Sequence, residues 1–170
     1  LRGRHFGSMM KIGIPAGLQA SLYSVSNMVI QVGVNTLGTG GVASWAMTSK
    51  IDGLYWAVSN AMGSAVTTFI GQNIGAGKMD RVKLCVKQGF ILSESITVAV
   101  SALIIALSRP LLGVLTDDAA VVDTTYRMLI LFVPFYFTWT VIEVISAVLR
   151  GAGDAVKPVI IIGLGICFFR

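Results

Sequence analysis

The chain has 170 residues, of which 55% are hydrophobic and only 12% are charged, and its mean hydropathy is +0.80. A soluble domain is about a quarter charged, so too few charges are present here to cover a water-facing surface. The net charge of +5 does not indicate a nucleic-acid partner, because the basic residues fall in short clusters between apolar runs. One histidine, His5, and two isolated cysteines give no disulfide framework, metal-ligand spacing or catalytic triad. We expect a membrane protein that is not an enzyme and holds no cofactor or metal.

Four apolar runs are long enough for membrane helices, which need about 20 mostly apolar residues. The predicted spans are residues 12–37, 42–70, 89–107 and 125–149, followed by the start of a fifth over 157–170. Residues 1–170 therefore predict an all-α, polytopic membrane helical bundle that forms one partial transmembrane domain, with turns at 71–88 and 150–157. Because the chain has no initiator methionine and its fifth span is short, we expect it to be part of a longer protein.

Lysine and arginine gather on one side of these predicted spans. The opposite loops carry only Arg109 and Arg127, beside three aspartates. Cytoplasmic loops of membrane proteins carry the excess of basic residues, so we expect a multi-pass inner-membrane protein whose N-terminal end here is cytoplasmic. The nine residues of the basic side are Arg2, Arg4, Lys11, Lys78, Arg81, Lys83, Lys87, Arg150 and Lys157.

The loop sequence "GQNIGAGKMDR" looks like a nucleotide-binding turn but lacks the required register. A P-loop has four residues between its first glycine and Gly-Lys, followed by Ser or Thr. Here five residues separate Gly71 from Gly77, and Met79 replaces the hydroxyl that would hold magnesium. The stretch is better interpreted as a turn between two helices. Its amides Gln72 and Asn73 can hydrogen-bond carbonyls at a helix end.

Three stretches together resemble the multidrug and toxic compound extrusion (MATE) family: "IGIPAGLQASLYSVSNMVIQVGVNTLG", "TTFIGQNIGAGKMDR" and "EVISAVLRGAGDAVKP". In that family a G-Q-N/A-x-G-A-G turn follows the second helix of a six-helix half, and an L-R-G-x-G-D/S turn follows the fourth. The spacing here matches that order. The residues of the two motif turns are Gly71, Gln72, Asn73, Gly75, Gly77, Arg81, Arg150, Gly151 and Gly153.

The resemblance implies one half of a two-lobed, twelve-helix antiporter. The opening helix lacks the aspartate that first halves often carry, so the chain corresponds to the C-terminal half, and its implied partner is the missing N-terminal six-helix half. The implied function is secondary active, cation-coupled export of amphipathic, cationic drugs or toxins by alternating access, with Na⁺ or H⁺ as the coupling ion. An alternative is a flippase for a lipid-linked precursor, since relatives of this fold do such work.

Span one carries a polar residue at nearly every fourth position, which places one polar stripe along a helix. The stripe either lines a cavity that hydrogen-bonds a small-molecule substrate or joins packed helices through amide hydrogen bonds. Mid-span positions favour the cavity for Asn27 and Gln31. The residues of the stripe are Gln19, Tyr23, Asn27, Gln31 and Asn35.

Three charged side chains within the spans are candidates for the ion or substrate pathway, because such groups are costly in a bilayer. Glu143 is a lone carboxylate in span four, where it either exchanges protons for a cation or pairs structurally with a cation such as Lys50. Asp52 in span two either contacts substrate or ion, or lies near the outer interface beside Tyr55 and Trp56 as belt aromatics. Lys50 is two residues from Asp52, so we expect the two not to pair.

Overall fold

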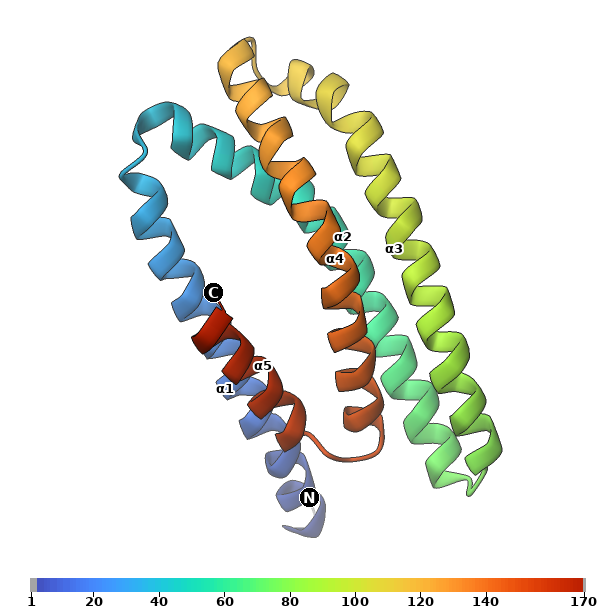
Figure 1. Cartoon of the computed structure of the whole chain (residues 1–170). Coiled ribbons are helices and arrows are strands. Elements are labelled where there is room, and N and C mark those ends of the chain that lie inside the picture. Colours follow the sequence, from blue (N-terminus) through green and yellow to red (C-terminus); the bar gives the residue numbers. More distant parts are fainter. Residues whose placement is uncertain (1–2, 170) are drawn as a thin grey trace.

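The computed structural model describes residues 3–169, and within this range the chain forms five α-helices joined by short turns (Figure 1). The side chains of Arg2, Arg4, His5, Lys11 and Cys167 lie outside the described residues. The all-helical prediction is confirmed. The helices are α1 (Gly3–Asn35), α2 (Gly38–Gly75), α3 (Met79–Leu115), α4 (Ala119–Gly151) and α5 (Val156–Phe169).

The helices extend beyond most of the predicted span ends. The expected turn over 71–88 is helical except at residues 76–78, because the lysine, arginine and leucine residues that follow are good helix formers outside the hydrocarbon core. Helix α3 also continues past residue 107, where the predicted span ends, and through Pro110 to Leu115, since a proline removes a helical hydrogen bond without necessarily ending the helix. Among the described helices, α3 and α4 are long and apolar enough to cross a membrane by length and composition.

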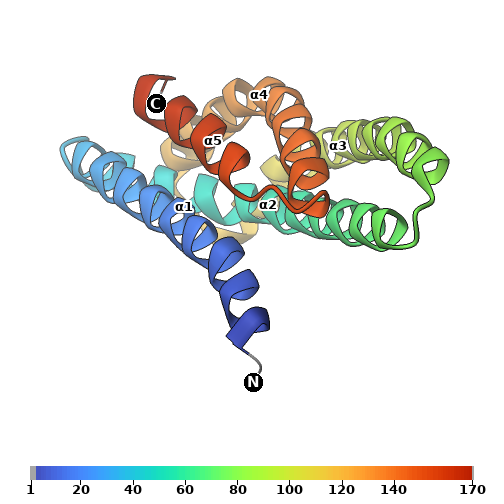
Figure 2. The same ribbon diagram turned by 90° about the horizontal axis from the view of Figure 1, so that it is seen from below.

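Helices α2, α3 and α4 pack into a three-helix bundle, while α1 and α5 pair with each other beside it (Figures 1 and 2). The bundle has an apolar core that includes Tyr55, Leu112, Leu129 and Tyr136. Many other buried positions are serine or threonine, which let membrane helices approach closely and hydrogen-bond across their interfaces. These buried hydroxyl residues are Ser44, Thr48, Ser59, Ser93, Thr97, Ser101, Ser108, Thr125, Thr140 and Ser146.

Both glycine-rich motif turns form the same helix cap. After α2, the N–H of Lys78 bonds the carbonyl of Asn73, and the N–H of Gly77 bonds that of Ile74. After α4, Gly153 and Asp154 make the equivalent bonds to carbonyls of the last turn of that helix. This is the Schellman pattern, which needs a left-handed residue, and Gly77 and Gly153 have φ of 71° and 88°.

The two motif turns also meet in space. A Cβ on Gly151 would lie 2.7 Å from the Thr67 carbonyl oxygen and 2.8 Å from Ile70 Cβ, so the end of α4 rests directly on α2. On α2, a Cβ on Gly71 would lie 3.4 Å from the Gly151 carbonyl oxygen. Buried Asn73 donates to the Phe69 carbonyl at 2.8 Å, while Gln72 and Arg81 are exposed. The motif glycines therefore serve helix capping and helix contact.

Asp154 begins α5 immediately after the second cap. Its Oδ1 accepts from the N–H groups of Val156 and Lys157, both at 3.2 Å, and its Oδ2 lies 2.9 Å from Lys157 Nζ. The hydrogen bonds from Lys157 hold the pKa of the Asp154 carboxyl below its usual range. The α4–α5 turn thus carries a charged cap that stays ionised to lower pH than a free aspartate.

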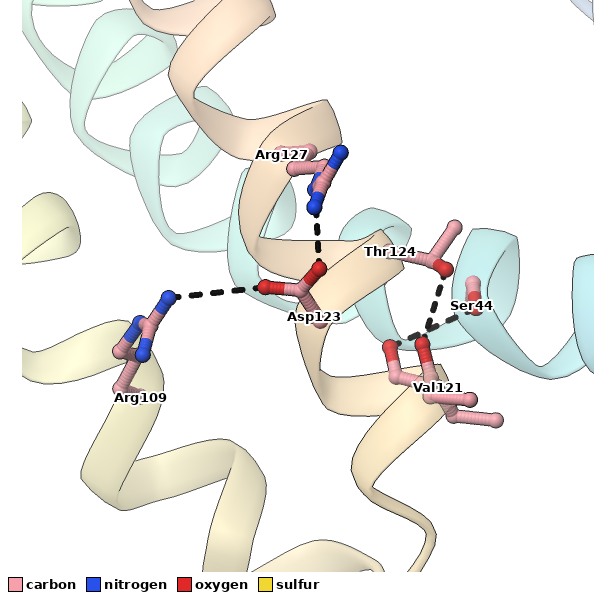
Figure 3. Close-up of polar contacts among 7 residues, drawn as sticks. Ser44, Arg109, Val121, Asp123, Thr124 and Arg127 are labelled. Atoms are coloured by element: carbon pink, nitrogen blue, oxygen red, sulfur yellow. Dashed lines mark hydrogen bonds and ion pairs between the residues drawn. The ribbon is translucent and has the colours of Figure 1, made fainter.

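The α3–α4 turn lies at the opposite end of the bundle (Figure 1), where the two basic residues form ion pairs with an aspartate (Figure 3). Asp118 caps α4 by accepting from the N–H of Ala120 at 2.9 Å. Asp123 lies 2.8 Å from Arg127 and 3.5 Å from Arg109. The two arginines of this end are thus both paired with a carboxylate. The assignment of the other end to the cytoplasm stays a prediction.

Candidate functional site

Asp52 lies on the α2–α4 interface, held by two aromatic donors. Trp56 Nε1, one turn along α2, donates to Asp52 Oδ2 at 2.7 Å. Tyr136 of α4 donates its hydroxyl to Asp52 Oδ1 at 2.5 Å. The carboxylate is half-buried, so it is neither sealed in the core nor free on the surface. As expected, it does not pair with Lys50, whose side chain is exposed.

An aromatic cluster surrounds this carboxylate and joins three helices. The Tyr55 and Tyr136 rings stack with centroids 3.8 Å apart, and those of Trp56 and Trp139 are 4.8 Å apart. Tyr23 of α1 reaches the Trp139 ring edge-on at 6.1 Å. Tyr55 is only 2% exposed, which excludes its interpretation as a belt aromatic at the interface. The "aromatic cluster" below means Tyr23, Tyr55, Trp56, Tyr136 and Trp139.

A chain of hydroxyl groups runs from the aromatic cluster into the middle of the bundle. The Tyr55 hydroxyl donates to the Tyr136 carbonyl at 2.9 Å and lies 3.0 Å from Thr140 Oγ1. Thr140 Oγ1 is in turn 2.7 Å from Thr97 Oγ1 of α3. These three residues link α2, α3 and α4 through polar contacts in an otherwise apolar interior.

Replacing Thr140 with valine is expected to lower the free energy of unfolding by about 1–3 kcal/mol, because the buried Thr97 hydroxyl loses its partner. The double change Thr97→Val with Thr140→Val is expected to recover most of the loss, since no hydroxyl of the pair then remains unsatisfied. Thermal unfolding in detergent checks this. A double variant less stable than either single variant would contradict the pairing.

Glu143 of α4 forms an ion pair with Arg150 two turns further along the same helix. Arg150 Nη2 donates to Glu143 Oε1 at 2.5 Å, and the side chains are only 27% and 13% exposed, respectively. Lys50, the cation considered from the sequence, is not the partner. On α2, a Cβ at Gly63 would clash with Glu143 Oε1, so this glycine makes room for the carboxylate.

The ion pair lines a polar groove between α2 and α4. The groove has a volume of about 310 Å³, and its lining from α2 is entirely hydroxyl and amide. Its residues are Asn60, Ser64, Thr67, Thr68, Glu143 and Arg150. Because Glu143 and Arg150 are partly exposed to this groove, they are reachable by small polar molecules from outside the bundle.

The polar stripe of α1 divides into two parts. Gln19 and Tyr23 are half-buried, whereas Asn27, Gln31 and Asn35 are exposed, and Gln31 donates to Asn35 Oδ1 at 3.0 Å. The described residues therefore do not bring the whole stripe into one wall with Asp52. Tyr23 belongs both to the stripe and to the aromatic cluster, through its contact with Trp139.

The sequence interpretation missed four residues of this region: Tyr136, Trp139, Thr97 and Thr140. One signal for two of them was available, because Tyr136 and Thr140 stand four residues apart on one helix face and therefore present hydroxyls to the same neighbour. Their partners lie more than 40 residues away, and spacing along the chain cannot indicate such pairs.

These features define the class of polytopic helical-bundle membrane proteins with polar groups packed between helices. The chain belongs to the MatE family, whose model matches residues 15–170. It is 25% identical over 153 residues to the probable multidrug resistance protein YoeA of Bacillus subtilis (strain 168), covering 90% of this chain and 33% of that protein. It is 22% identical to the probable multidrug resistance protein NorM of Thermotoga maritima, with the same coverages.

The fold also matches a solved structure. An MOP superfamily transporter from Pyrococcus furiosus superposes with a TM-score of 0.88 at 19% identity, over 94% of this chain and 35% of that one. At this identity the match establishes the fold alone. The chain spans about a third of the length of the relatives it matches.

Proposed function

We propose that the protein containing this chain exports amphipathic organic cations by alternating access, driven by entry of Na⁺ or H⁺. The observation that carries the proposal is the Asp52 carboxylate within the aromatic cluster. A carboxylate attracts a positive charge, and aromatic faces bind both cations and flat apolar groups. The family membership and the names of the multidrug resistance relatives support export of drugs.

Separate observations support the other two parts of the proposal, which are a second helical half and alternating access. Lys50 is exposed on α2, where a charged group within a membrane helix needs a partner or a water-filled cavity. A second helical half supplies that partner in the proposal, and the coverage of a third of each relative supports it. Pro15 and Pro134 lie inside α1 and α4, where each removes a helical hydrogen bond and permits bending between inward-facing and outward-facing states.

The test uses the protein as its gene encodes it, in energised membrane vesicles loaded with a fluorescent cationic dye. Dye export is expected to stop when the Na⁺ and H⁺ gradients are both dissipated, and to persist when the membrane is energised. Export that is unchanged without either gradient would overturn the coupling. A requirement for an anionic, lipid-linked substrate in the reconstituted protein would replace drug export with lipid flipping.

A further inference from the structure

Helix α3 turns one face away from the rest of the bundle. Among the described helices it packs against α2 and α4 alone, and it lies on the side of the bundle away from α1 and α5 (Figures 1 and 2). Val82 and Gly89 are buried on its inner face. The opposite face carries large apolar side chains that are more than half exposed, namely Leu84, Ile91 and Val98. The three are seven residues, or about two turns, apart, so they form one apolar line along the helix.

The first turns of α3 carry cations that no described carboxylate balances. Residues 78–88 contain four basic residues and one acidic residue, Asp80, which gives this stretch a net charge of +3. All four basic side chains are exposed, and none forms an ion pair with a described residue. Elsewhere among the described side chains, every basic residue except Lys50 is paired with a carboxylate. The four unpaired basic residues are Lys78, Arg81, Lys83 and Lys87.

Two of these cations stand on the same face as the apolar line. Lys87 is three residues after Leu84 and four before Ile91, so it lies between them on the helix surface. Lys83 lies one turn before Lys87 on the same side. From Lys87 to Val98 the helix rises about 16 Å, which is about half the thickness of the hydrocarbon core. The "outer face of α3" below means these five residues.

The outer face of α3 matches the two parts of an anionic phospholipid. Lysine side chains bind phosphate oxygens, and basic residues at a membrane surface attract anionic headgroups. Below the cations, the apolar line offers an acyl chain contact over the depth of one leaflet. Helix α3 is long and apolar enough to cross a membrane, so this line would lie in hydrocarbon, where an acidic protein segment in water does not reach. A zwitterionic lipid carries its own ammonium group and gains less from the two lysines.

We propose that the outer face of α3 binds an anionic phospholipid, whose phosphate contacts Lys83 and Lys87 and whose acyl chain lies along the apolar line. Lys78 and Arg81 lie at the same end of the helix and add positive charge to the surface that attracts the headgroup. The bound lipid holds the start of α3 at the level of the headgroups. This site does not depend on what the protein exports, and lipid binding is measurable without any transport.

The test counts bound lipids by native mass spectrometry of the purified protein, as its gene encodes it, in detergent with equal amounts of phosphatidylglycerol and phosphatidylcholine. The unchanged protein is expected to retain phosphatidylglycerol in preference. Lys83→Gln with Lys87→Gln is expected to weaken binding of one phosphatidylglycerol molecule at least tenfold, because both cations at the phosphate are lost. Lys83→Arg with Lys87→Arg is expected to keep that molecule, since arginine also binds phosphate.

Lys50→Gln with Lys157→Gln is the matched control, because it removes the same two charges from exposed side chains outside the outer face of α3. We expect this variant to bind phosphatidylglycerol like the unchanged protein. Glycerol 3-phosphate has the headgroup charge without acyl chains, and we expect it not to displace the lipid. Equal losses in the two glutamine variants, equal retention of the two lipids, or displacement by glycerol 3-phosphate would overturn the proposal. A poly-glutamate peptide that displaced the lipid would assign the face to an acidic protein segment instead.

Discussion

Replacing Gly151 with alanine is expected to lower the free energy of unfolding by about 1–3 kcal/mol, the usual cost of forcing an extra group into a tight contact. The new Cβ would lie 2.7 Å from the Thr67 carbonyl oxygen and 2.8 Å from Ile70 Cβ, and neither is the end of a flexible side chain. The end of α4 would have to move away from α2. Thermal or denaturant unfolding in detergent measures the loss.

Gly75→Ala is the matched control for this prediction. Gly75 and Gly151 are both the last residue of a helix that ends in the same cap, with an alanine next and a left-handed glycine after it. A Cβ on Gly75 meets nothing within 4 Å. We expect Gly75→Ala to leave stability unchanged or slightly raised, since alanine is the better helix former. Equal losses in the two variants would show that the cap, and not the helix contact, needs the glycine.

Replacing Asp52 with asparagine is expected to reduce export of a cationic dye at least tenfold, which corresponds to about 1.4 kcal/mol of lost interaction. The change keeps the size of the side chain and an oxygen that accepts from Tyr136 or Trp56, but it removes the charge. The aromatic cluster then offers only ring faces to the cation. Initial export rates over a range of dye concentrations check the prediction in energised vesicles.

Asp80→Asn controls for the loss of one negative charge elsewhere. Asp80 lies in the exposed first turn of α3 and makes no ion pair within the described residues. We expect this variant to export dye at the parent rate. If Asp52→Asn also exports at the parent rate while unfolding at the parent temperature, the carboxylate does not recognise the substrate.

The sequence predicted the helical membrane bundle, the order of the helices and the two motif turns. These features depend on local properties: the length of apolar runs and the glycines that permit a left-handed cap at Gly77 and Gly153. The helix ends were less predictable. Apolar content marks the part of a helix suited to the hydrocarbon core. Residues 79–88 continue the helix with charged side chains, and these lower the local hydropathy, so the apolar run begins after the helix does.

The candidate site was predicted only in part. Asp52 and Glu143 stood out because carboxylates in apolar runs are rare, but their partners did not. Glu143 pairs with Arg150 and not with Lys50, since seven residues span two helical turns and bring both side chains to the same face. Nothing local to Gly63 showed that it leaves room for this carboxylate from a neighbouring helix.

The sequence alone therefore determined the class of fold, the turns and which charged residues lie within helices, because each depends on residues close together in the chain. Only the tertiary structure decided what those residues contact. It placed Asp52 among the rings of Trp56 and Tyr136, and it placed Glu143 with Arg150 at a polar groove between α2 and α4. Contacts between residues more than 80 positions apart arise from how the helices pack, and periodicity within one helix carries no record of the helix that faces it.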